Sequence, residues 1–324
     1  MNSSIVLITE AQVTEMVGMA ESIAAVQRGL ESEAAGLARA EPKIVMPNGN
    51  GTSALHILGA AVVGLGIAGV KCFVQSPSGG RPLLSVFDVA DSRPLAVIEA
   101  SALSNLRTGA LAGIATRCLA ADGADELAVI GSGKQAWTQV AAVVATRHLK
   151  RIRVWSPTRA RCEAFAGKIA ATHGIETVAA ASPREALAGA LIVTLAARVD
   201  APLITPDMLA RGAHINAIGI TVPGRSELPA GIFPRCAAIC VDSLATVQAS
   251  SDEFRSYFKT QDHWREVRPL AALAASASVR PEGADLTLYK GMGSAVADLA
   301  MAAAILLRAR ADGLDIALPA ALEQ

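Results

Sequence analysis

The chain has 324 residues, which is long for one domain and typical of two. Hydrophobic residues make up 52% of the chain and aromatic residues only 3%, so we expect a core of Ala, Val, Leu and Ile, as in helices packed on a parallel sheet. Lys and Arg number 29, as do Asp and Glu, and this balance does not favour nucleic acid or a membrane surface as a partner.

The sequence shows no clear targeting or membrane-spanning segment. Residues 1–10 lack the basic and long apolar regions of a signal peptide, and the apolar run 57–70 is too short to cross a bilayer. Five cysteines have no spacing typical of a metal or redox site; they are Cys72, Cys118, Cys162, Cys236 and Cys240. We therefore expect a cytoplasmic protein with buried free thiols and no metal site.

The first third of the chain is predicted to form a helix followed by a small sheet. Thr9 is a typical helix cap, and apolar residues recur behind it at helical spacing as far as Ala20. Strands are predicted at 43–46, 54–58, 70–75, 83–88 and 95–98, separated by turn signals at 48–51, 76–80 and 91–94. We expect these strands to form a mixed or antiparallel sheet, followed by a helix from 101 to 120.

From residue 125 the pattern alternates between strand and helix. Strands are predicted at 127–131, 151–155, 175–179, 190–195, 213–219 and 237–242, and helices at 134–148, 158–172 and 183–189. Ser182 is expected to cap the last of these helices, with Pro183 in its first turn and Glu185 completing a capping box. This alternation predicts an α/β fold with a doubly wound parallel sheet, and 290–311 is predicted as a further long helix.

A glycine turn stands between the first strand and the first helix of this region. The apolar run Leu127–Ile130 leads directly into Gly131-Ser-Gly133-Lys-Gln-Ala136. The first glycine permits the turn, the second lets a pyrophosphate approach the backbone, and Ala136 lets the helix pack on the strand. Because the free N–H groups of the helix would face the phosphates, the turn predicts a nicotinamide dinucleotide site and hence a redox enzyme.

A second string, Gly64-Leu-Gly66-Ile-Ala-Gly69, has the same glycine spacing. It is even followed, further along the chain, by an acidic residue, Asp88. However, Val70–Val74 directly after it is predicted to be a strand, whereas a phosphate loop must open a helix. We therefore interpret this string as a turn before a strand.

The end of the second strand of the doubly wound region bears on the choice of dinucleotide. No Asp or Glu follows Arg151–Trp155, where an acidic residue would bind the ribose hydroxyls of NAD. Ser156, Thr158 and Arg159 would suit the 2′-phosphate of NADP, although a solvated basic loop explains the same residues. We predict NADP(H), with NAD(H) as the alternative. The residues expected to contact the dinucleotide are Gly131, Ser132, Gly133, Lys134, Gln135, Ala136, Ser156, Thr158, Arg159, Leu195, Ala196, Gly219, Lys290 and Gly291.

Short motifs follow one another along nearly the whole chain. They are Gly69-Val-Lys71, Phe87-Asp88, Leu106-Arg107-Thr108-Gly109-Ala110, His214 to Gly219, Pro223 with Glu227-Leu228, and Leu288 to Gly293 with Asp298. Their order resembles that of the ornithine cyclodeaminase/mu-crystallin family. The resemblance implies a Rossmann NAD(P)-binding domain, here placed at 119–299. It also implies a mixed α/β substrate-binding and dimerisation domain, here placed at 1–118 and 300–324, and a homodimer.

The resemblance assigns roles to two basic residues. Lys71 matches the family's active-site lysine, and burial between apolar strand neighbours would make its ammonium group a better proton donor or acceptor near neutral pH. Arg107 matches the arginine of the family's Arg-Thr motif and would bind a substrate carboxylate through two parallel hydrogen bonds. The alternatives are a surface lysine and a structural salt bridge.

Two positions depart from the family pattern. Many members carry an arginine where this chain has Lys43, and a lysine keeps the charge but loses the planar fork of donors. Cyclodeaminases resembling this chain carry an aspartate at the position of Thr221, and a threonine cannot act as a base at neutral pH. The reductase branch commonly has a small neutral residue there, which favours a reductase.

The predicted reaction is NAD(P)H-dependent reduction of small cyclic ketimine carboxylates, with Δ1-pyrroline-2-carboxylate giving proline and Δ1-piperideine-2-carboxylate giving pipecolate. Lys43, Lys71 and Arg107 would bind the carboxylate, Lys71 would protonate the nitrogen, and Thr221 would add a neutral hydrogen bond. The alternatives are an ornithine cyclodeaminase, an amino acid dehydrogenase resembling alanine dehydrogenase, and an NADP-binding protein resembling mu-crystallin that turns over no substrate.

Overall fold

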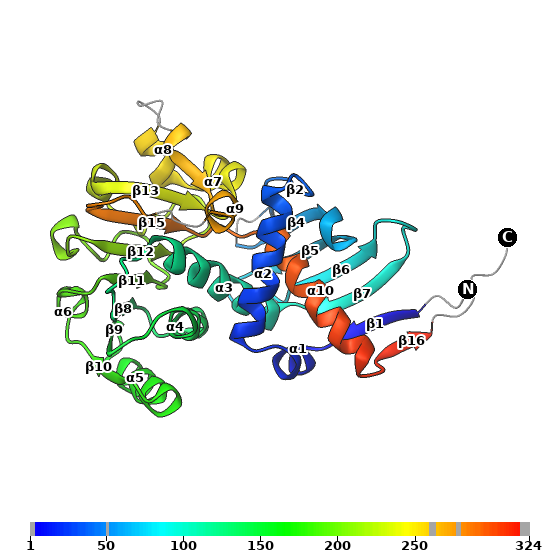
Figure 1. The fold of residues 1–324 in the computed structure, drawn as a ribbon, viewed down its shortest axis with the longest axis horizontal. Coiled ribbons are helices and arrows are strands. Elements are labelled where there is room, and N and C mark those ends of the chain that lie inside the picture. Colours follow the sequence, from blue (N-terminus) through cyan, green and yellow to red (C-terminus); the bar gives the residue numbers. More distant parts are fainter. Residues whose placement is uncertain (1–3, 50–51, 259–263, 277–279, 318–324) are drawn as a thin grey trace. The chain divides into compact units, whose positions relative to one another are not determined.

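Two compact units make up the chain in the computed structural model, which describes residues 4–49, 52–258, 264–276 and 280–317 (Figure 1). The first unit comprises Met1–Arg107 together with Ser294–Gln324, and the second comprises Thr108–Gly293. The first division lies inside helix α3 (Ser101–Leu119), and the second lies just before helix α10 (Ala295–Ala311). The domain boundaries proposed from the sequence, at 118/119 and 299/300, lie further along the same two helices and stay a prediction.

A mixed sheet forms the centre of the first unit. In the described part of the chain its strands lie in the order β16-β1-β7-β6-β5-β4-β2, with β3 paired to β4. β1 and β7 are parallel neighbours and the other pairs are antiparallel, which confirms the predicted mixed sheet. The strands are β1 (Ser4–Ile8), β2 (Ala38–Ala40), β3 (Ile44–Pro47), β4 (Ala54–Val62), β5 (Ile67–Gln75), β6 (Leu83–Asp88), β7 (Pro94–Glu99) and β16 (Asp315–Ala317).

Two long helices of this unit pack against each other. They are α2 (Met19–Ala34) and α10, and α10 also lies against β4 and β5. The predicted cap at Thr9 is confirmed: its side chain accepts a hydrogen bond from the Gln12 N–H at 3.4 Å, and the Gln12 side chain accepts one from the Thr9 N–H at 2.9 Å. The apolar face predicted as far as Ala20 is divided between α1 (Glu10–Met16) and α2, because the chain turns at Gly18.

The hairpin of β4 and β5 explains the second glycine string. A short 3-10 turn (Val63–Leu65) ends at Gly66, whose φ of 72° suits glycine, and β5 begins at the next residue. This confirms a turn before a strand. A Cβ on Gly69 would lie 2.3 Å from the Ser85 carbonyl oxygen and 2.9 Å from Leu299 Cδ2. Gly69 therefore allows β5 to lie close to both β6 and α10.

The second unit contains a wholly parallel sheet, as predicted. Its described strands lie in the order β10-β9-β8-β11-β12-β15-β13-β14. They are β8 (Glu126–Ile130), β9 (Arg151–Trp155), β10 (Glu176–Ala179), β11 (Ile192–Leu195), β12 (Ala213–Ala217), β13 (Cys236–Val241), β14 (Val267–Pro269) and β15 (Leu286–Lys290). The connecting helices include α4 (Lys134–Thr146), α5 (Arg159–His173), α6 (Pro183–Leu187), α7 (Leu244–Ser250), α8 (Asp252–Phe258) and α9 (Leu270–Ala274).

Several details of the second unit differ from the prediction. Lys290, predicted to begin a helix, is the last residue of β15, because a short and mostly apolar segment such as Leu286–Tyr289 does not by itself distinguish a strand from a buried helix. Ser182 caps α6 by accepting from the Glu185 N–H at 3.1 Å. The Glu185 carboxylate instead accepts from the N–H of Ala181, one residue before the cap.

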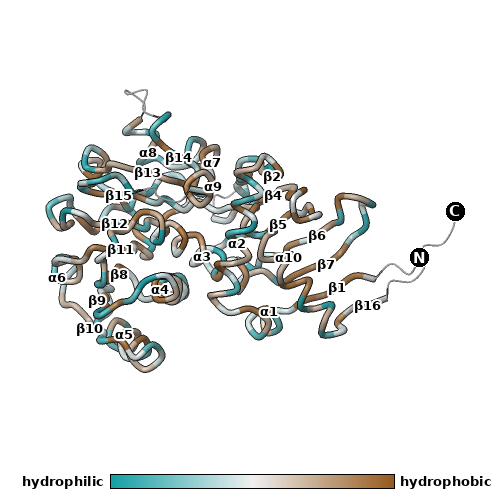
Figure 2. The backbone as a smooth tube through the Cα atoms, viewed as in Figure 1, coloured by the Kyte–Doolittle hydropathy of each residue, from teal (hydrophilic) through white to brown (hydrophobic). Residues whose placement is uncertain are grey.

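Hydrophobic stretches of the chain follow the strands and α10, while hydrophilic ones gather in the connections (Figure 2). Among the described residues no helix is long and apolar enough to cross a membrane. All five cysteines are free thiols. The expectation that they are buried is confirmed for Cys162 and Cys240, whereas Cys118 and Cys236 are half-buried and Cys72 is exposed. Its side chain is exposed because it points away from the face of β5 that α10 covers. Of the predicted turn at 48–51, Asn50 and Gly51 lie outside the described residues.

Candidate active site

The glycine turn of the second unit lies at the switch point of the parallel sheet. The chain runs from β8 to β9 on one side and returns to β11 on the other, so the carboxyl ends of β8 and β11 border the crevice where such sheets bind ligands. Gly131 has a φ of 128°, and a Cβ there would lie 2.8 Å from the Ala196 carbonyl oxygen. A Cβ on Gly133 would meet no atom within 4 Å. Glycine is therefore required at position 131, and at position 133 the backbone has open space in which a ligand can approach it.

The start of α4 fits a dinucleotide diphosphate. Gly133 is the N-cap residue, so no side chain caps the first N–H groups of the helix, which suits an anion. Ala136 is fully buried, as close packing of the helix on β8 requires, whereas Lys134 is exposed. Ser132 Oγ donates to Ser156 Oγ at 3.0 Å, which ties the glycine turn to the loop after β9.

That loop contains the residues predicted to bind the 2′-phosphate of NADP. Ser156 is buried, while Thr158 is exposed at the N-cap position of α5. Arg159 Nε donates to Glu163 Oε1 at 2.6 Å, and its Nη1 donates to the Ala179 carbonyl at 3.1 Å. A phosphate would therefore compete with the Glu163 carboxylate for the Arg159 guanidinium.

Gln135, also predicted to contact the cofactor, is half-buried in the first turn of α4. The remaining predicted residues lie at or just after the carboxyl ends of other strands. Leu195 and Gly291 are buried, and Ala196 and Gly219 are half-buried. Thr221 follows in the loop after β12, where it is half-buried and interacts with other residues of the protein.

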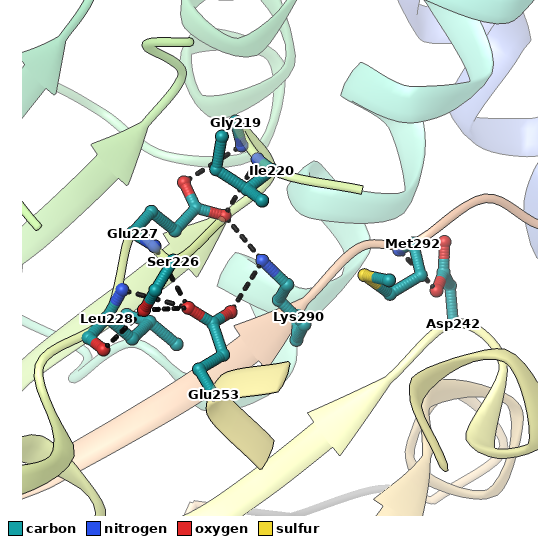
Figure 3. Close-up of polar contacts among 9 residues, drawn as sticks. All are labelled: Gly219, Ile220, Ser226, Glu227, Leu228, Asp242, Glu253, Lys290 and Met292. Atoms are coloured by element: carbon teal, nitrogen blue, oxygen red, sulfur yellow. Dashed lines mark hydrogen bonds and ion pairs between the residues drawn. The ribbon is translucent and has the colours of Figure 1, made fainter. Parts of the chain in front are cut away.

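Lys290 is engaged by the protein itself. Its Nζ lies 2.6 Å from Glu227 Oε1 and 2.8 Å from Glu253 Oε1, and all three side chains are buried (Figure 3). Burial alone would lower the pKa of Lys290, but the two carboxylates outweigh it and raise that pKa. The predicted contact of Lys290 with the cofactor stays a prediction, and the geometry assigns its ammonium group to these carboxylates.

In the first unit, Lys71, Arg107 and Asp298 form a buried ion cluster. Lys71 Nζ lies 2.6 Å from Asp298 Oδ2, and Arg107 Nε lies 2.9 Å from Asp298 Oδ1. The side chains of Lys71, Asp298 and Arg107 are 2%, 1% and 9% exposed. The alternative of a surface lysine is therefore excluded. Asp298 occupies the first turn of α10, which places its carboxylate against the covered face of β5.

Burial lowers the pKa of Lys71 to about 8. Asp298 opposes this shift by favouring the ammonium form, while the charges of Arg107 and Lys43 add to it. At neutral pH Lys71 is therefore mostly protonated and yet gives up its proton far more easily than an ordinary lysine. The predicted role of Lys43 in binding a carboxylate stays a prediction.

Each cation of the cluster contacts the protein through identified atoms. Lys71 Nζ donates one of its three N–H groups to Ser104 Oγ at 3.1 Å and forms an ion pair with Asp298 Oδ2. Arg107 does form the salt bridge proposed as its structural alternative, but through Nε. That contact uses Nε, and the two Nη groups form the edge of a guanidinium that suits a carboxylate.

Sequence reasoning gave no role to two residues of this cluster. Asp298 is quoted in the family motif, and its one signal is that it is the single acidic residue in the apolar run of 295–311. Ser104 has no signal in the sequence, because its contact with Lys71 depends on how α3 packs against β5.

One unit of the chain is a doubly wound parallel sheet with a glycine turn, and the other holds a buried Lys–Asp–Arg cluster on a mixed sheet. These features define an NAD(P)-dependent oxidoreductase of the two-unit α/β class. Within the described residues, no group of three or more His, Cys, Asp or Glu side chains is arranged to hold a metal ion. Residues 4–313 match the ornithine cyclodeaminase/mu-crystallin family, and the chain belongs to that family.

Relatives within the family include several reductases. The chain is 26% identical to a Δ(1)-pyrroline-2-carboxylate reductase of Bacillus cereus (strain ZK / E33L), over 89% of this chain and 91% of the relative. It is 29% identical to the ketimine reductase mu-crystallin of Mus musculus, over 67% of this chain and 66% of the relative. The fold matches that of the Δ(1)-pyrroline-2-carboxylate reductase of Thermococcus litoralis, solved with NADH and L-proline, with a TM-score of 0.90 at 23% identity, covering 97% of this chain and 100% of the other.

Proposed function

We propose that this protein is an NAD(P)H-dependent reductase of small cyclic ketimine carboxylates, forming proline from Δ1-pyrroline-2-carboxylate and pipecolate from Δ1-piperideine-2-carboxylate. The observation that carries the proposal is the buried Lys71–Asp298–Arg107 cluster. Two cations share one carboxylate, so the cluster has one positive charge left for one substrate carboxylate. The reductases among the relatives act on substrates of this class, which supports the same assignment here.

The dinucleotide would be held by the second unit. The glycine turn at 131–133 and the uncapped start of α4 would bind its diphosphate. When bound, the reduced nicotinamide supplies a hydride to the carbon of the C=N bond.

The cations of the first unit would bind the substrate and supply a proton. The two Nη groups of Arg107 would donate parallel hydrogen bonds to the carboxylate, and Lys43 would add positive charge. The third N–H of Lys71 would donate to the ring nitrogen, and a protonated imine is the better hydride acceptor. With a pKa of about 8, Lys71 can hold this proton at neutral pH and release it as the amine forms. Thr221 would contribute a neutral hydrogen bond.

We infer a preference for NADPH over NADH. In support, the loop after β9 contains no acidic residue among Ser156, Pro157, Thr158 and Arg159, so nothing there repels a 2′-phosphate. Ser156 is already tied to the glycine turn through Ser132, and Arg159 would exchange Glu163 for the phosphate.

We also infer that the protein is a homodimer formed through the uncovered face of the first sheet. Along β6, Leu84 and Val86 are buried, whereas Leu83 and Phe87 point to the other face and are 47% and 39% exposed. On the neighbouring strand β5, Val74 is 50% exposed. A row of large apolar side chains on one face of a sheet is typical of a protein interface, and a second copy offers the same apolar face.

The test is an assay of the purified protein with both imines, ornithine and L-alanine, each with NADPH, NADH or their oxidised forms. We expect nicotinamide oxidation with the imines, stoichiometric proline or pipecolate, and faster turnover with NADPH. Lys71→Met is expected to lower kcat/KM about 100-fold or more while NADPH binding is retained.

Other outcomes would select another function. Release of ammonia and proline from ornithine without net cofactor change would indicate a cyclodeaminase, and NAD-dependent oxidation of L-alanine would indicate an alanine dehydrogenase. Tight NADPH binding with no turnover of any substrate would indicate a binding protein.

A further inference from the structure

Three buried charged groups meet at one point of the second unit. Lys290 comes from the end of β15, Glu253 from α8, and Glu227 from the connection between β12 and β13. The side chains of these residues are 1%, 3% and 3% exposed, and Lys290 Nζ lies between the two carboxylates (Figure 3). The predicted reaction assigns no task to Glu253.

The two carboxylates also bind backbone at both ends of the loop 219–228. Glu227 Oε2 accepts from the Gly219 N–H at 2.9 Å, and Glu227 Oε1 accepts from the Ile220 N–H at 3.2 Å. Glu253 Oε2 accepts from the N–H groups of Glu227 and Leu228, each at 3.0 Å. Lys290 joins the two carboxylates, so the loop is closed on itself and anchored to β15 and α8.

The loop that is closed in this way contains Thr221 and borders the ligand edge of the sheet. Glu227 lines a small apolar cavity together with Ile130, Leu195 and Ala197, which belong to the carboxyl ends of β8 and β11. Gly219 allows the closure, because a Cβ there would lie 2.3 Å from the Ala197 carbonyl oxygen and 2.7 Å from Glu227 Oε2.

The free energy of folding alone does not explain why buried charges hold this loop. Two carboxylates face one ammonium group, and burial raises the pKa of Glu227 even though Lys290 opposes this shift. Buried ion pairs generally stabilise a protein no more than well-packed apolar residues would, because the charges lose their hydration. What they add is directed geometry, since each oxygen fixes a particular N–H group.

We propose that Lys290, Glu227 and Glu253 are positioning residues that hold the loop 219–228, with Thr221, against the dinucleotide edge of the sheet. Lys290 acts through the two glutamates and does not bind the dinucleotide. The kinetic part of this inference rests on the proposed reductase function, whereas loop order and NADPH affinity do not.

The test measures hydrogen exchange of the backbone amides, NADPH affinity and kinetics in Glu253→Gln and Lys290→Met. Both variants should exchange the amides of residues 219, 220, 227 and 228 at least about tenfold faster than wild type. In Glu253→Gln the amides of 227 and 228 lose a charged acceptor, and in Lys290→Met both carboxylates lose the ammonium group that holds them in place. Both should also raise the Kd for NADPH or the KM for the imine. The effect of Glu253→Gln on kcat/KM should not add to that of Thr221→Ala.

The control is Asp285→Asn, which breaks the Arg235–Asp285 ion pair just before the amino end of the same strand β15. It should leave the exchange of residues 219–228 and the NADPH affinity unchanged, even if it lowers Tm by a similar amount. Glu253→Gln keeps the shape of the side chain and decides the test if Lys290→Met does not fold.

Three results would overturn the inference. One is unchanged exchange of the loop amides in Glu253→Gln. Another is faster exchange with unchanged NADPH affinity and unchanged KM, which would make the cluster purely structural. The third is loss of NADPH binding in Lys290→Met with the loop still protected, which would mean that Lys290 binds the dinucleotide directly. If the wild-type protein reduced no imine, the proposed function would fail, while the exchange and NADPH measurements would still decide this inference.

Discussion

Asp298 binds Lys71 and Arg107 through different oxygens of one carboxylate, at 2.6 Å and 2.9 Å. The arrangement neutralises one of two neighbouring cations and fixes how both are oriented. The same carboxylate opposes the effect of burial on the pKa of Lys71. The first two predictions depend on this relationship.

Replacing Asp298 with Asn should lower kcat/KM for imine reduction about 100-fold, because the donor geometry of both cations is lost. The pKa of Lys71 should fall further below 8, since the charge that raises it is gone. A pH–rate profile of the variant would show its upper limb displaced toward lower pH. Asp312→Asn, at the exposed end of the same helix, is the control and should change neither quantity. An unchanged profile in Asp298→Asn would contradict the assigned role.

The wild-type enzyme should lose reductase activity as the pH rises through about 8, because burial lowers the pKa of Lys71 to that value and only the ammonium form donates a proton. Oxidation of proline, which needs the neutral amine of Lys71 as a proton acceptor, should increase over the same pH range. Initial rates of reduction and of oxidation, measured between pH 6 and 10, roughly two units either side of this pKa, would show the change of each rate with pH. If the same loss of reductase activity with rising pH persisted in Lys71→Arg, a group other than Lys71 would be responsible for it.

Replacing Ser156 with Asp should weaken NADPH binding more than NADH binding. A carboxylate at the end of β9 repels a 2′-phosphate and can bind ribose hydroxyls instead. We expect the ratio of the KM values for NADPH and NADH to rise about tenfold, which corresponds to ~1.4 kcal/mol. Thr205→Asp, at a position before the 3-10 turn Pro206–Met208, serves as the control. An equal rise in the KM for NADPH and for NADH would mean that the loop after β9 does not contact the 2′-phosphate.

Replacing Leu83 with Asp should produce monomers at concentrations where the wild type is dimeric. Leu83 is 47% exposed on the uncovered face of the first sheet, and a charge in an apolar interface remains without a partner. Light scattering coupled to size-exclusion chromatography gives the mass directly. Leu307→Asp is the matched control, because Leu307 is 70% exposed on α10 and should leave the mass unchanged. A monomeric wild type would contradict the homodimer.

Gly69→Ala should lower the free energy of unfolding by about 2–4 kcal/mol, since an added Cβ would overlap the Ser85 carbonyl and press on Leu299. Gly59→Ala, on the facing strand, would place its Cβ 3.7 Å from the Gly69 carbonyl oxygen and should change the free energy by less than about 0.5 kcal/mol. Urea unfolding of the two variants provides the comparison. Equal stabilities would show that β5 and α10 do not depend on glycine at position 69.

The sequence by itself determined the doubly wound sheet, the glycine turn and the candidate cations. Apolar runs of strand length that alternate with segments of helical periodicity are local patterns of the sequence. Gly131 stands between such a strand and such a helix, where the tight turn requires glycine. The same local rule correctly separated Gly64–Gly69 from a phosphate loop, because a strand follows it. The family motif identified Lys71 and Arg107, which are far apart in the chain.

Only the tertiary structure decided which partners those cations have. The cluster joins Lys71 to Asp298 across 227 positions of sequence, and the protonation of Lys71 depends on burial that no local pattern reports. Lys290, predicted to begin a helix, is the last residue of a buried strand and lies between two glutamates. The physical reason is that electrostatic and hydrogen-bonding partners are set by packing between elements, whereas turns and periodicity are set within them.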